Sequence, residues 1–278
     1  MTQLTGTRNL PINPPTFVEA CLLVVRRNLL HIKRMPELLM DVTIQPVMFV
    51  LLFAYVFGSS IDVPGTNYKE FLIPGIMAQT MVFSSFIVAL GLVNDLEKGF
   101  VDRLKSLPIS RASILVGRSL SSLIHSSIGI GVMALTGLLV GWRIRDGVVD
   151  AAFAFCLLLL FGFGMIWVGI WMGSILRTPE AVQGFGFTVM FPLTFLANTF
   201  APTQTMPTWL RTVCEWNPVS ALTQSLRELW GNDRGVPLPD SASWPLHHAE
   251  LVTAFWAVLI TAVMAPIALR AFHKRSRN

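Results

Sequence analysis

Six long apolar runs dominate the pattern of hydrophobic and polar positions along the chain. Each run holds about 20 residues or more, enough for a helix to cross a hydrocarbon core of ~30 Å. A lipid core admits only helices and closed barrels as spanning structures, and these runs are far too long for barrel strands. The pattern therefore predicts an all-α membrane protein with six transmembrane helices, and Pro46 falls near the start of the first. The runs cover residues 42–61, 72–93, 114–141, 151–176, 182–200 and 251–269.

An amphipathic segment precedes the first run. Thr16 and Glu19 stand three residues apart, which is the spacing of a capping box at a helix N-terminus. Apolar residues from Phe17 to Leu29 then recur at helical spacing, and basic residues gather toward Arg34. We expect an amphipathic helix over residues 16–36 on the cytoplasmic membrane surface, although a plain basic flank of the first span fits the same pattern.

The chain before this segment, residues 1–15, is polar and contains three prolines. We expect a flexible tail here. Residues 1–15 contain no short apolar core followed by a small-residue cleavage site, so we expect no signal peptide.

The most charged stretch of the chain, residues 97–111, separates the second run from the third. Its basic residues outnumber its acidic ones, as is typical of a loop that stays in the cytoplasm. Apolar residues recur within it at helical spacing until Pro108, which favours a short amphipathic helix. Such a helix at a membrane face is a docking surface, and a solvated loop that only sets topology is the alternative. The apolar positions are Phe100, Val101, Leu104 and Leu107.

The segment between the fifth and sixth runs, residues 201–249, is too apolar for a plain loop and too broken for a span. Pro207 begins one short predicted helix. Asn217 as a cap and Pro218 in the first turn begin a second, which Gly231 can close. With their tryptophans, these two helices are expected to dip into the outer leaflet and return. The tryptophans are Trp209, Trp216 and Trp230.

Charged residues make up 13% of the 278 residues and hydrophobic ones 53%. A soluble domain carries about 25% charged residues, so the composition supports a membrane protein, and the net charge of +5 indicates contact with membrane lipid rather than nucleic acid. With both termini cytoplasmic, six of the 21 basic residues fall outside, which leaves 15 inside. We therefore expect cytoplasmic termini, a basic tail at residues 272–278, and Trp142 in an interfacial aromatic belt. The six outside are Lys69, Arg143, Arg145, Arg211, Arg227 and Arg234.

Motifs for catalysis and nucleotide binding are missing from the sequence. Without a Gly-Lys-Ser or Gly-Lys-Thr there is no Walker motif, so we do not expect this chain to hydrolyse ATP by itself. Inside the runs, the ionisable residues are Arg118 and His125, both in the third. We expect Arg118 to extend toward the headgroups and His125 to hydrogen-bond a neighbouring helix. The three cysteines lack metal-ligand spacing, so neither a disulfide framework nor a metal site is expected. They are Cys21, Cys156 and Cys214.

Two further patterns concern helix packing and aromatic lining. The Gly-x3-Gly pairs at 137–141 and 169–173 allow close approach of helices. Phenylalanines recur at helical spacing in the first and fifth runs, where they line a path for an apolar substrate, face lipid or fill the core. They are Phe49, Phe53 and Phe57, and Phe187, Phe191 and Phe195. We assign all six, together with His125, to a candidate substrate path.

From residue 16 onward the chain resembles the membrane subunit of type-2 ABC exporters, the ABC-2 family, and in particular its daunorubicin-resistance-type permeases. The stretch 97–111 running into 114–118 is similar to the family's acidic-Arg-Leu, Ser/Thr-x-Pro and Arg pattern, where a coupling helix meets the ATPase. Residues 16–34 resemble the family's connecting helix, and 206–227 its re-entrant outer helices. Phe100 and Leu107 stand where the family often has Thr.

The resemblance implies an ABC-2 transmembrane domain at residues 42–271 in a multi-pass protein of a bacterial plasma membrane. Two copies, or one copy with a related permease, would pair with two cognate ABC ATPase subunits that bind ATP and Mg, while this chain holds no cofactor. Closure of the ATPases would then export a hydrophobic or amphiphilic drug, lipid or glycolipid from the cytoplasm or inner leaflet. The implied coupling residues are Glu97, Lys98, Gly99, Phe100, Asp102, Arg103, Leu104, Leu107, Pro108, Arg111, Arg177 and Glu180, and the implied outer gate is Trp209, Trp216, Asn217 and Pro218.

Other functional classes remain open at this point. A membrane scaffold or channel subunit would keep the docking loop without ATP-driven flux. A membrane-embedded enzyme is disfavoured, because the runs hold no nucleophile-base pair and no metal-ligand set.

Overall fold

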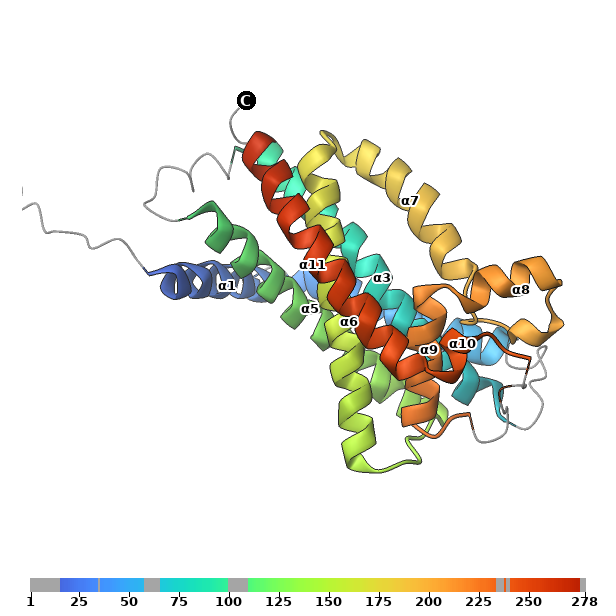
Figure 1. Ribbon diagram of the computed structural model, residues 1–278. Coiled ribbons are helices and arrows are strands. Elements are labelled where there is room, and N and C mark those ends of the chain that lie inside the picture. Colours follow the sequence, from blue (N-terminus) through green and yellow to red (C-terminus); the bar gives the residue numbers. More distant parts are fainter. Residues whose placement is uncertain are drawn as a thin grey trace, which may run out of the picture.

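A computed structural model describes residues 16–34, 36–57, 66–99, 110–233, 238 and 241–275 of the chain; side chains at 31–34, 36–43, 57, 111 and 205 are outside this description. Within the described ranges every regular element is helical, which confirms the predicted all-α class (Figure 1). The elements are α1 (Phe17–Arg34), α2 (Pro36–Leu52), η1 (Phe53–Phe57), α3 (Tyr68–Glu97), α5 (Arg111–Val140), α6 (Val148–Ile175), α7 (Pro179–Phe195), η2 (Thr203–Thr205), α8 (Thr208–Glu215), α9 (Pro218–Leu229), α10 (Trp244–His247) and α11 (Ala249–Arg275).

Four of the described helices, α3, α5, α6 and α11, are long and apolar enough to cross a membrane. The other two predicted spans are not in this group. The first forms α2 and the π-helical turn η1, which follow one another from Pro36 to Phe57. The fifth forms α7, whose 17 residues reach about 26 Å at 1.5 Å per residue. Because α2 begins at Pro36, Pro46 lies inside the helix and not near its start as predicted.

The packing of α3 against α6 forms the centre of the molecule. A Cβ atom at Gly169 would overlap the carbonyl oxygen of Ser85, and one at Gly173 would lie 2.8 Å from the carbonyl oxygen of Ala89. The two backbones therefore touch directly, which confirms the close packing predicted for this Gly-x3-Gly pair. Buried apolar side chains surround the contact, with α11 on the other side of α6 (Figure 1).

The C-terminal end of α5 differs from the prediction. Gly141 ends the helix with a φ of 109°, and nothing lies within 4 Å of the place its Cβ would take. It is therefore a helix-terminating glycine and not part of a packing pair with Gly137. Trp142 next turns inward, is fully buried and donates from Nε1 to Oδ1 of Asn232 at 2.8 Å. The predicted place of Trp142 in an interfacial belt is wrong, because the turn folds it against Trp230.

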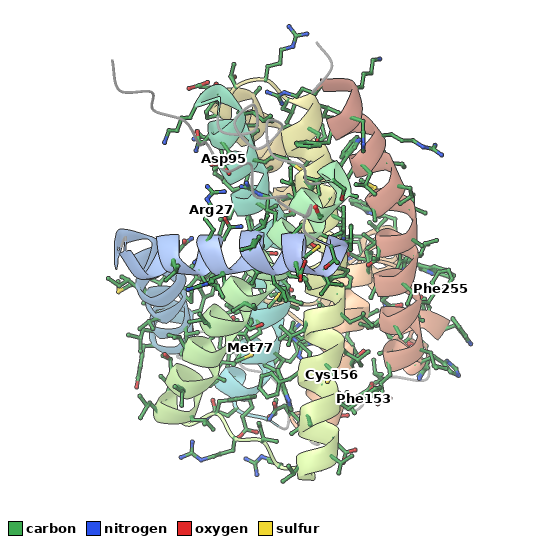
Figure 2. The ribbon with its side chains drawn as sticks, turned by 90° about the vertical axis from the view of Figure 1, so that its left-hand side faces the viewer. Arg27, Met77, Asp95, Phe153, Cys156 and Phe255 are labelled. Atoms are coloured by element: carbon green, nitrogen blue, oxygen red, sulfur yellow. The ribbon has the colours of Figure 1, made fainter. Side chains whose placement is uncertain are left out.

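Helix α1 lies across the others, as Figure 2 shows. Its predicted capping box is confirmed: the Thr16 amide donates to the Glu19 carboxylate at 2.8 Å, and the Glu19 amide to the Thr16 hydroxyl at 3.4 Å. Its buried side, which includes Cys21 and Val24, packs on α5 at Gly117, where a Cβ would lie 2.8 Å from Cβ of Val24. Apolar side chains on its opposite side stay exposed, which suits a helix lying along a membrane surface.

The ends of the long helices gather into two groups (Figure 1). At one, the Arg275 end, α3 and α11 finish, α5 begins, and α6 turns into α7. Here Arg275 donates to the carbonyl oxygens of Gly173, at 2.8 Å, and Leu176. The helix α11 thus continues to Arg275, into the segment predicted as a tail. At the other, the Gly141 end, α3 and α11 begin and α5 turns into α6.

Candidate functional site

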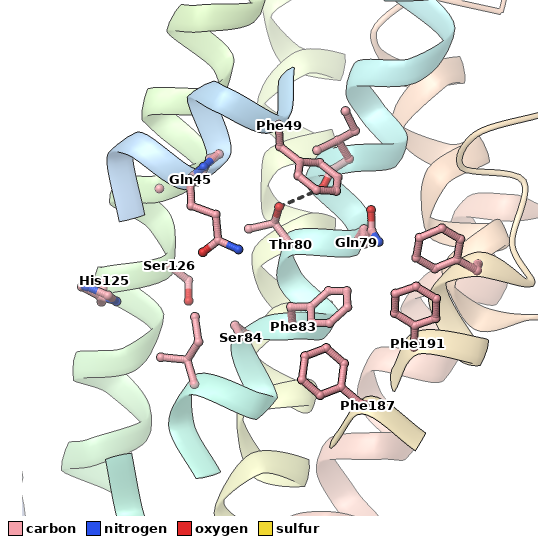
Figure 3. A pocket seen from close by; sticks show the side chains of 15 residues that line it. Gln45, Phe49, Gln79, Thr80, Phe83, Ser84, His125, Ser126, Phe187 and Phe191 are labelled. Atoms are coloured by element: carbon pink, nitrogen blue, oxygen red, sulfur yellow. Dashed lines mark hydrogen bonds between the residues drawn. The ribbon is translucent and has the colours of Figure 1, made fainter. Parts of the chain in front are cut away.

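The described helices enclose a cavity of about 290 Å³ between α2, α3, α5 and α7 (Figure 3). Side chains from α3 form one wall, and Phe187, Phe191 and Phe195 of α7 form the opposite one. Phe49 of α2 and His125 of α5 complete the lining. We call this space the aromatic cavity. Its size is close to the lower limit of small-molecule sites, roughly 300 Å³.

Five of the seven residues predicted for the substrate path line the aromatic cavity. Their helical spacing on α2 and α7 turns them to one side, and the rings of Phe191 and Phe195 stack with centroids 4.1 Å apart. Phe53 lies outside the lining, between the rings of Phe49 and Phe200. The residue Phe57 ends η1, and its side chain is outside the described part of the chain.

The hydroxyl groups of the α3 wall donate their protons within the helix and keep only acceptor capacity toward the cavity. The hydroxyl of Thr80 donates to the carbonyl oxygen of Ile76 at 2.9 Å, and that of Ser84 to Met81 at 2.7 Å. These bonds within the helix use the hydroxyl protons. Gln79 is the exception: its side chain is 4% exposed, and its amide oxygen has no hydrogen-bond partner. The lining is therefore mostly apolar, with Gln45, Gln79, His125 and hydroxyl groups as its polar members.

A second, more polar cavity of about 370 Å³ lies beside the first, toward the Arg275 end, between α1, α3 and α5. Arg118 and Asp95 form an ion pair in its wall. The side chain of Arg118 crosses to α3 over Gly91, whose missing Cβ leaves room for the guanidinium, and reaches Asp95 in the last turn of α3. That Arg118 reaches the lipid headgroups stays a prediction. His125 lines both cavities.

The coupling residues predicted in the first loop are described only at its edges. Helix α3 ends at Glu97, and the amides of Lys98 and Gly99 donate to carbonyl oxygens of its last turn at 3.1 Å. Helix α5 begins at Arg111. Phe100, Asp102, Arg103, Leu104, Leu107 and Pro108 lie outside the described residues.

The predicted second contact, Arg177 and Glu180, lies in the turn between α6 and α7 at the same end of the molecule. Thr178 caps α7 by accepting from the amide of Ala181 at 3.2 Å. Arg275 holds the end of α6 directly before this turn. The turn is therefore fixed to both neighbouring long helices.

The predicted outer gate divides into exposed and buried members. Trp209 and Trp216 are 71% and 59% exposed. Asn217 is buried; its side-chain oxygen caps α9 by accepting from the amide of Val219 at 2.8 Å, and Pro218 follows in the first turn. Its side-chain amide also donates to the carbonyl oxygens of Leu193 and Leu196, both at 2.7 Å. Asn217 thus joins the end of α7 to the start of α9.

Arg227 of α9 was placed in an outer loop by the sequence, but its side chain is buried inside the molecule. It donates to the carbonyl oxygens of Phe71 at 2.9 Å, Asn198 at 2.8 Å and Thr199 at 3.4 Å. Burial lowers the pKa of Arg227 to about 9, so the guanidinium stays charged at neutral pH. The charge is therefore compensated by backbone carbonyls, and one side chain ties α9 to α3 and to the chain after α7.

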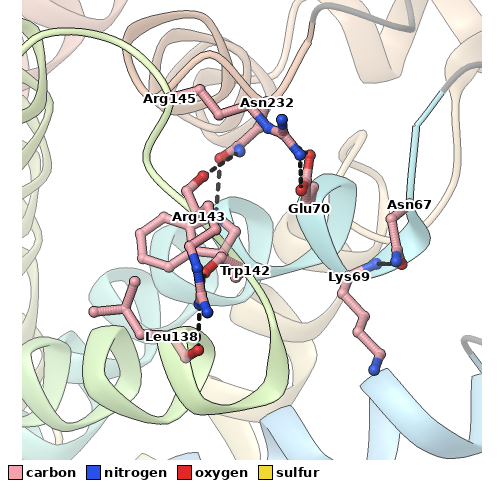
Figure 4. A network of polar contacts seen from close by, with 8 residues as sticks. All are labelled: Asn67, Lys69, Glu70, Leu138, Trp142, Arg143, Arg145 and Asn232. Atoms are coloured by element: carbon pink, nitrogen blue, oxygen red, sulfur yellow. Dashed lines mark hydrogen bonds and ion pairs between the residues drawn. The ribbon is translucent and has the colours of Figure 1, made fainter.

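A second missed contact closes the Gly141 end (Figure 4). Arg145 donates to both carboxylate oxygens of Glu70, at 2.6 and 3.2 Å, and the backbone amide of Arg145 donates to the carbonyl oxygen of Trp230. The Glu70 carboxylate raises the pKa of Arg145. The sequence could not reveal this ion pair, because Glu70 and Arg145 lie 75 positions apart.

A third group fixes the outer segment. The Glu215 carboxylate accepts from Arg211 Nε at 2.6 Å and from the amide and hydroxyl of Ser243 at 2.8 and 2.6 Å. Burial raises the pKa of Glu215, but these hydrogen bonds outweigh it and hold the pKa below its usual value. The ionised carboxylate thereby joins α8 to the start of α10.

Comparison with known proteins gives a consistent result. Residues 19–229 match the family model for the ABC-2 type transporter. The chain is 29% identical to the daunorubicin resistance ABC transporter permease protein DrrB1 of Streptomyces coeruleorubidus, over 95% of this chain and 89% of that protein. It is 28% identical to the putative transport permease ycf38 of Cyanophora paradoxa, over 78% and 76%. It is 23% identical to the probable doxorubicin resistance ABC transporter permease protein DrrC of Mycobacterium tuberculosis, over 81% of each.

Proposed function

The chain belongs to the ABC-2 type transporter family, and from this premise we propose that it is the membrane permease subunit of an ATP-driven exporter of hydrophobic or amphiphilic molecules. The observation that carries the proposal is the placement of the aromatic cavity. It opens among helices of which α3 ends, α5 begins and α6 turns into α7 at the Arg275 end. A force applied at this end acts directly on helices α3, α5 and α7, which line the cavity.

We propose six membrane crossings, with α2, continued by η1, and α7 as the other two. Helix α6 finishes at the Arg275 end and α11 begins at the Gly141 end, so the chain between them crosses from one end to the other. The helix α7 covers that distance. Helix α1 packs on the first turns of α5, while α3 begins at the opposite end, where Lys69 donates to the carbonyl oxygen of Val140 at 3.3 Å. Helix α2 makes that crossing.

We place the Arg275 end in the cytoplasm. Basic residues at a cytoplasmic face orient a membrane protein. At the Gly141 end, the basic side chains already serve the fold: Arg145 pairs with Glu70, Arg211 with Glu215, and Arg227 with backbone carbonyls. These charges belong to internal contacts and do not argue for a cytoplasmic position of that end. Both termini then lie on the cytoplasmic side of a bacterial plasma membrane.

The partner we propose is an ABC ATPase that docks on the 97–111 stretch and on the turn at Arg177 and Glu180. Two copies of the ATPase would act with two permease chains. They would bind ATP and Mg, for which this chain has no Walker motif. Homologous ABC-2 permeases are membrane subunits of such transporters.

The test is co-purification with the ATPase subunit of the native host, followed by ATP-dependent export from proteoliposomes. A triple variant with Arg103, Leu104 and Leu107 changed to Asp is expected to lose the ATPase and the transport. The matched control changes one arginine and two exposed valines at the opposite end, Arg143, Val148 and Val149, to Asp. If both triple variants retain the ATPase, the assignment of the docking surface to the 97–111 stretch is wrong. If ATP drives no flux with the complex intact, the exporter assignment is wrong.

A further inference from the structure

A row of five phenylalanine rings runs from α2 across to α7. The centroids of neighbouring rings are 4.8, 4.9, 5.1 and 4.1 Å apart, in order from α2. The middle ring follows α7 in the chain and stacks on the ring before it at an interplanar angle of 28°. We call this set the ring row, and its members in order are Phe49, Phe53, Phe200, Phe195 and Phe191. Figure 3 shows Phe49 and Phe191, from the two sides of the row, across the aromatic cavity from each other.

The ring row lies along the side of the aromatic cavity that faces the Gly141 end. Lys69, at the start of α3, lies 4.6 Å from the centre of the Tyr55 ring, which places η1 at that end. Helix α7 also runs toward it. The two rings that stack on each other, Phe53 and Phe200, come later in the chain than their neighbours in the row and lie outside the cavity lining, to which those neighbours belong. The stacked pair therefore covers the cavity from the Gly141 end.

The chain that carries Phe200 is held firmly against α3. The hydroxyl of Tyr68 donates to the carbonyl oxygen of Phe200 at 3.3 Å. Arg227 donates to the carbonyl oxygens of the two preceding residues. At Gly75 of α3, a Cβ atom would lie 2.8 Å from the carbonyl oxygen of Thr199, so the two backbones touch. One side of the ring row is therefore fixed to the centre of the molecule.

The element that carries Phe53 is less regular. Helix α2 has Pro46 in its interior, where the ring removes one hydrogen bond of the helix. Phe53 begins η1, and π-helical turns of this kind are frequent at functional sites. A proline and a π turn are both places where a helix bends. Within the described residues α2 packs mainly on α5 and little on α3. This side of the ring row can therefore move with α2 and α5 while Phe200 stays in place.

We propose that the stacked rings of Phe53 and Phe200 form a gate that closes the aromatic cavity toward the Gly141 end, and this inference rests on the proposed function. A stacked ring pair adds only a modest free energy, so a displacement of α2 separates it while the backbone contacts of α3 stay intact. In the topology proposed above, an apolar molecule held between α3 and α7 leaves toward the outer side when the pair parts. The tryptophans predicted for an outer gate, Trp209 and Trp216, are exposed and lie outside the cavity lining.

The gate is tested by cysteine accessibility in membrane vesicles that contain the full-length chain without any ATPase. Thr80 of α3, which lines the cavity, is changed to Cys in a chain whose three native cysteines are changed to Ala. A membrane-impermeant methanethiosulfonate is added to right-side-out and to inside-out vesicles. Val148→Cys, at a position 86% exposed at the Gly141 end, shows which vesicles present that end to the reagent. In those vesicles we expect Thr80→Cys to react at least about tenfold more slowly than Val148→Cys.

Removing either ring of the stacked pair is expected to open the cavity on one side only. Phe53→Ala and Phe200→Ala should each raise the labelling rate of Thr80→Cys from the Gly141 end about fivefold, and from the opposite end less than about twofold. The matched control is Phe163→Ala on α6, whose ring is half-buried like the other two and lies outside the cavity lining. This control is expected to change the rate less than about twofold from either end.

A covalent bridge tests whether the pair must part during export. Phe53→Cys and Phe200→Cys, made together in the cysteine-free chain, are joined by a short bifunctional methanethiosulfonate. With the ATPase present, the bridge is expected to lower ATP-driven export at least about tenfold, and a reducing agent to restore it. The control bridge joins Leu251→Cys to Phe255→Cys within α11, at positions 68% and 60% exposed, and is expected to leave export unchanged.

Three results overturn the inference: fast labelling of Thr80→Cys from the Gly141 end with both rings in place, an equal rise in Phe163→Ala and the two ring variants, or export that continues across the Phe53–Phe200 bridge. The labelling arm uses no ATPase, so its failure leaves the exporter assignment untouched. If labelling follows the expectation while ATP drives no flux in the unbridged protein, the exporter assignment is wrong and the gate stands.

Discussion

The guanidinium carbon of Arg227 lies 3.6 Å from the centre of the Phe71 ring, and Nε of the same side chain donates to the Phe71 carbonyl oxygen at 2.9 Å. The ring and the carbonyl together cover the buried cation. Since α3 carries Phe71 and α9 carries Arg227, this contact fixes the outer short helix against a wall helix of the aromatic cavity. The arrangement makes the outer segment part of the core.

Replacing Arg227 by Met is expected to destabilise the protein by roughly 2–5 kcal/mol, because the carbonyl oxygens of Phe71, Asn198 and Thr199 lose their donor while buried. Thermal unfolding in detergent measures the effect. The exposed Arg143→Met at the same end is the control and is expected to cost less than about 1 kcal/mol. Equal unfolding temperatures for the two variants would show that the Arg227 contacts add nothing.

Gly169→Ala is expected to destabilise the protein by about 1–3 kcal/mol, because the new Cβ would overlap the backbone of Ser85. Gly131→Ala and Gly184→Ala are the controls, since nothing lies within 4 Å of either Cβ position. At those two helical positions alanine is expected to be neutral or slightly stabilising. If Gly169→Ala is as stable as the two control variants, α3 and α6 do not pack backbone to backbone.

Asn217→Asp separates the two roles of this side chain. An aspartate keeps the capping oxygen for the Val219 amide but removes the donor to Leu193 and Leu196. We expect Asn217→Asp to lose roughly 1–3 kcal/mol, comparable to Asn217→Ala, because unpaired buried carbonyls dominate the cost. Asn67→Ala, which removes only a cap at α3, is expected to lose about 1 kcal/mol. If Asn217→Asp unfolds like the unchanged protein, capping is the whole role of Asn217.

Glu228 of α9 is expected to make stability depend on pH. Burial, followed by the neighbouring charges of Asp233 and Glu250, raises the pKa of Glu228 from 4.5 to about 7. The folded protein therefore holds this proton more tightly than the unfolded chain does. The stabilisation is fully present below pH 4.5 and is lost as the pH rises through about 7.

Glu228→Gln removes this titration. The stability difference between wild type and variant is expected to change by up to about 3 kcal/mol between pH 5 and pH 8.5, with wild type losing stability toward high pH. Unfolding at both pH values measures it, and Glu180→Gln, at an exposed carboxyl, is the control. A constant difference across the range contradicts a raised pKa at Glu228.

Local features of the fold could be predicted from the sequence because their causes are local. The capping box of Thr16 and Glu19 and the start of α9 at Asn217 depend on residues within one helical turn of each other. The alignment of Phe187, Phe191 and Phe195 on one cavity wall follows from helical spacing alone.

Contacts between helices distant in sequence could not be predicted in this way. The ion pair of Arg118 was missed because its partner, Asp95, lies on a different helix and past the end of the predicted apolar run. Trp142 has the composition of an interfacial residue, and only the turn at Gly141 directs it inward. Arg227 was counted among the outside basic residues because only the packing of α3, α6 and α11 around α9 buries this helix on several sides.

The bare contact between Gly169 and Ser85 also limits how the molecule deforms. Side chains can change rotamer to let two helices slide, but here the two backbones meet with no side chain between them. We therefore expect the helices α3 and α6 to move as one piece. Since α3 forms a wall of both cavities, a change in their shape would come from displacement of α1, α2, α5 or α7 against this pair.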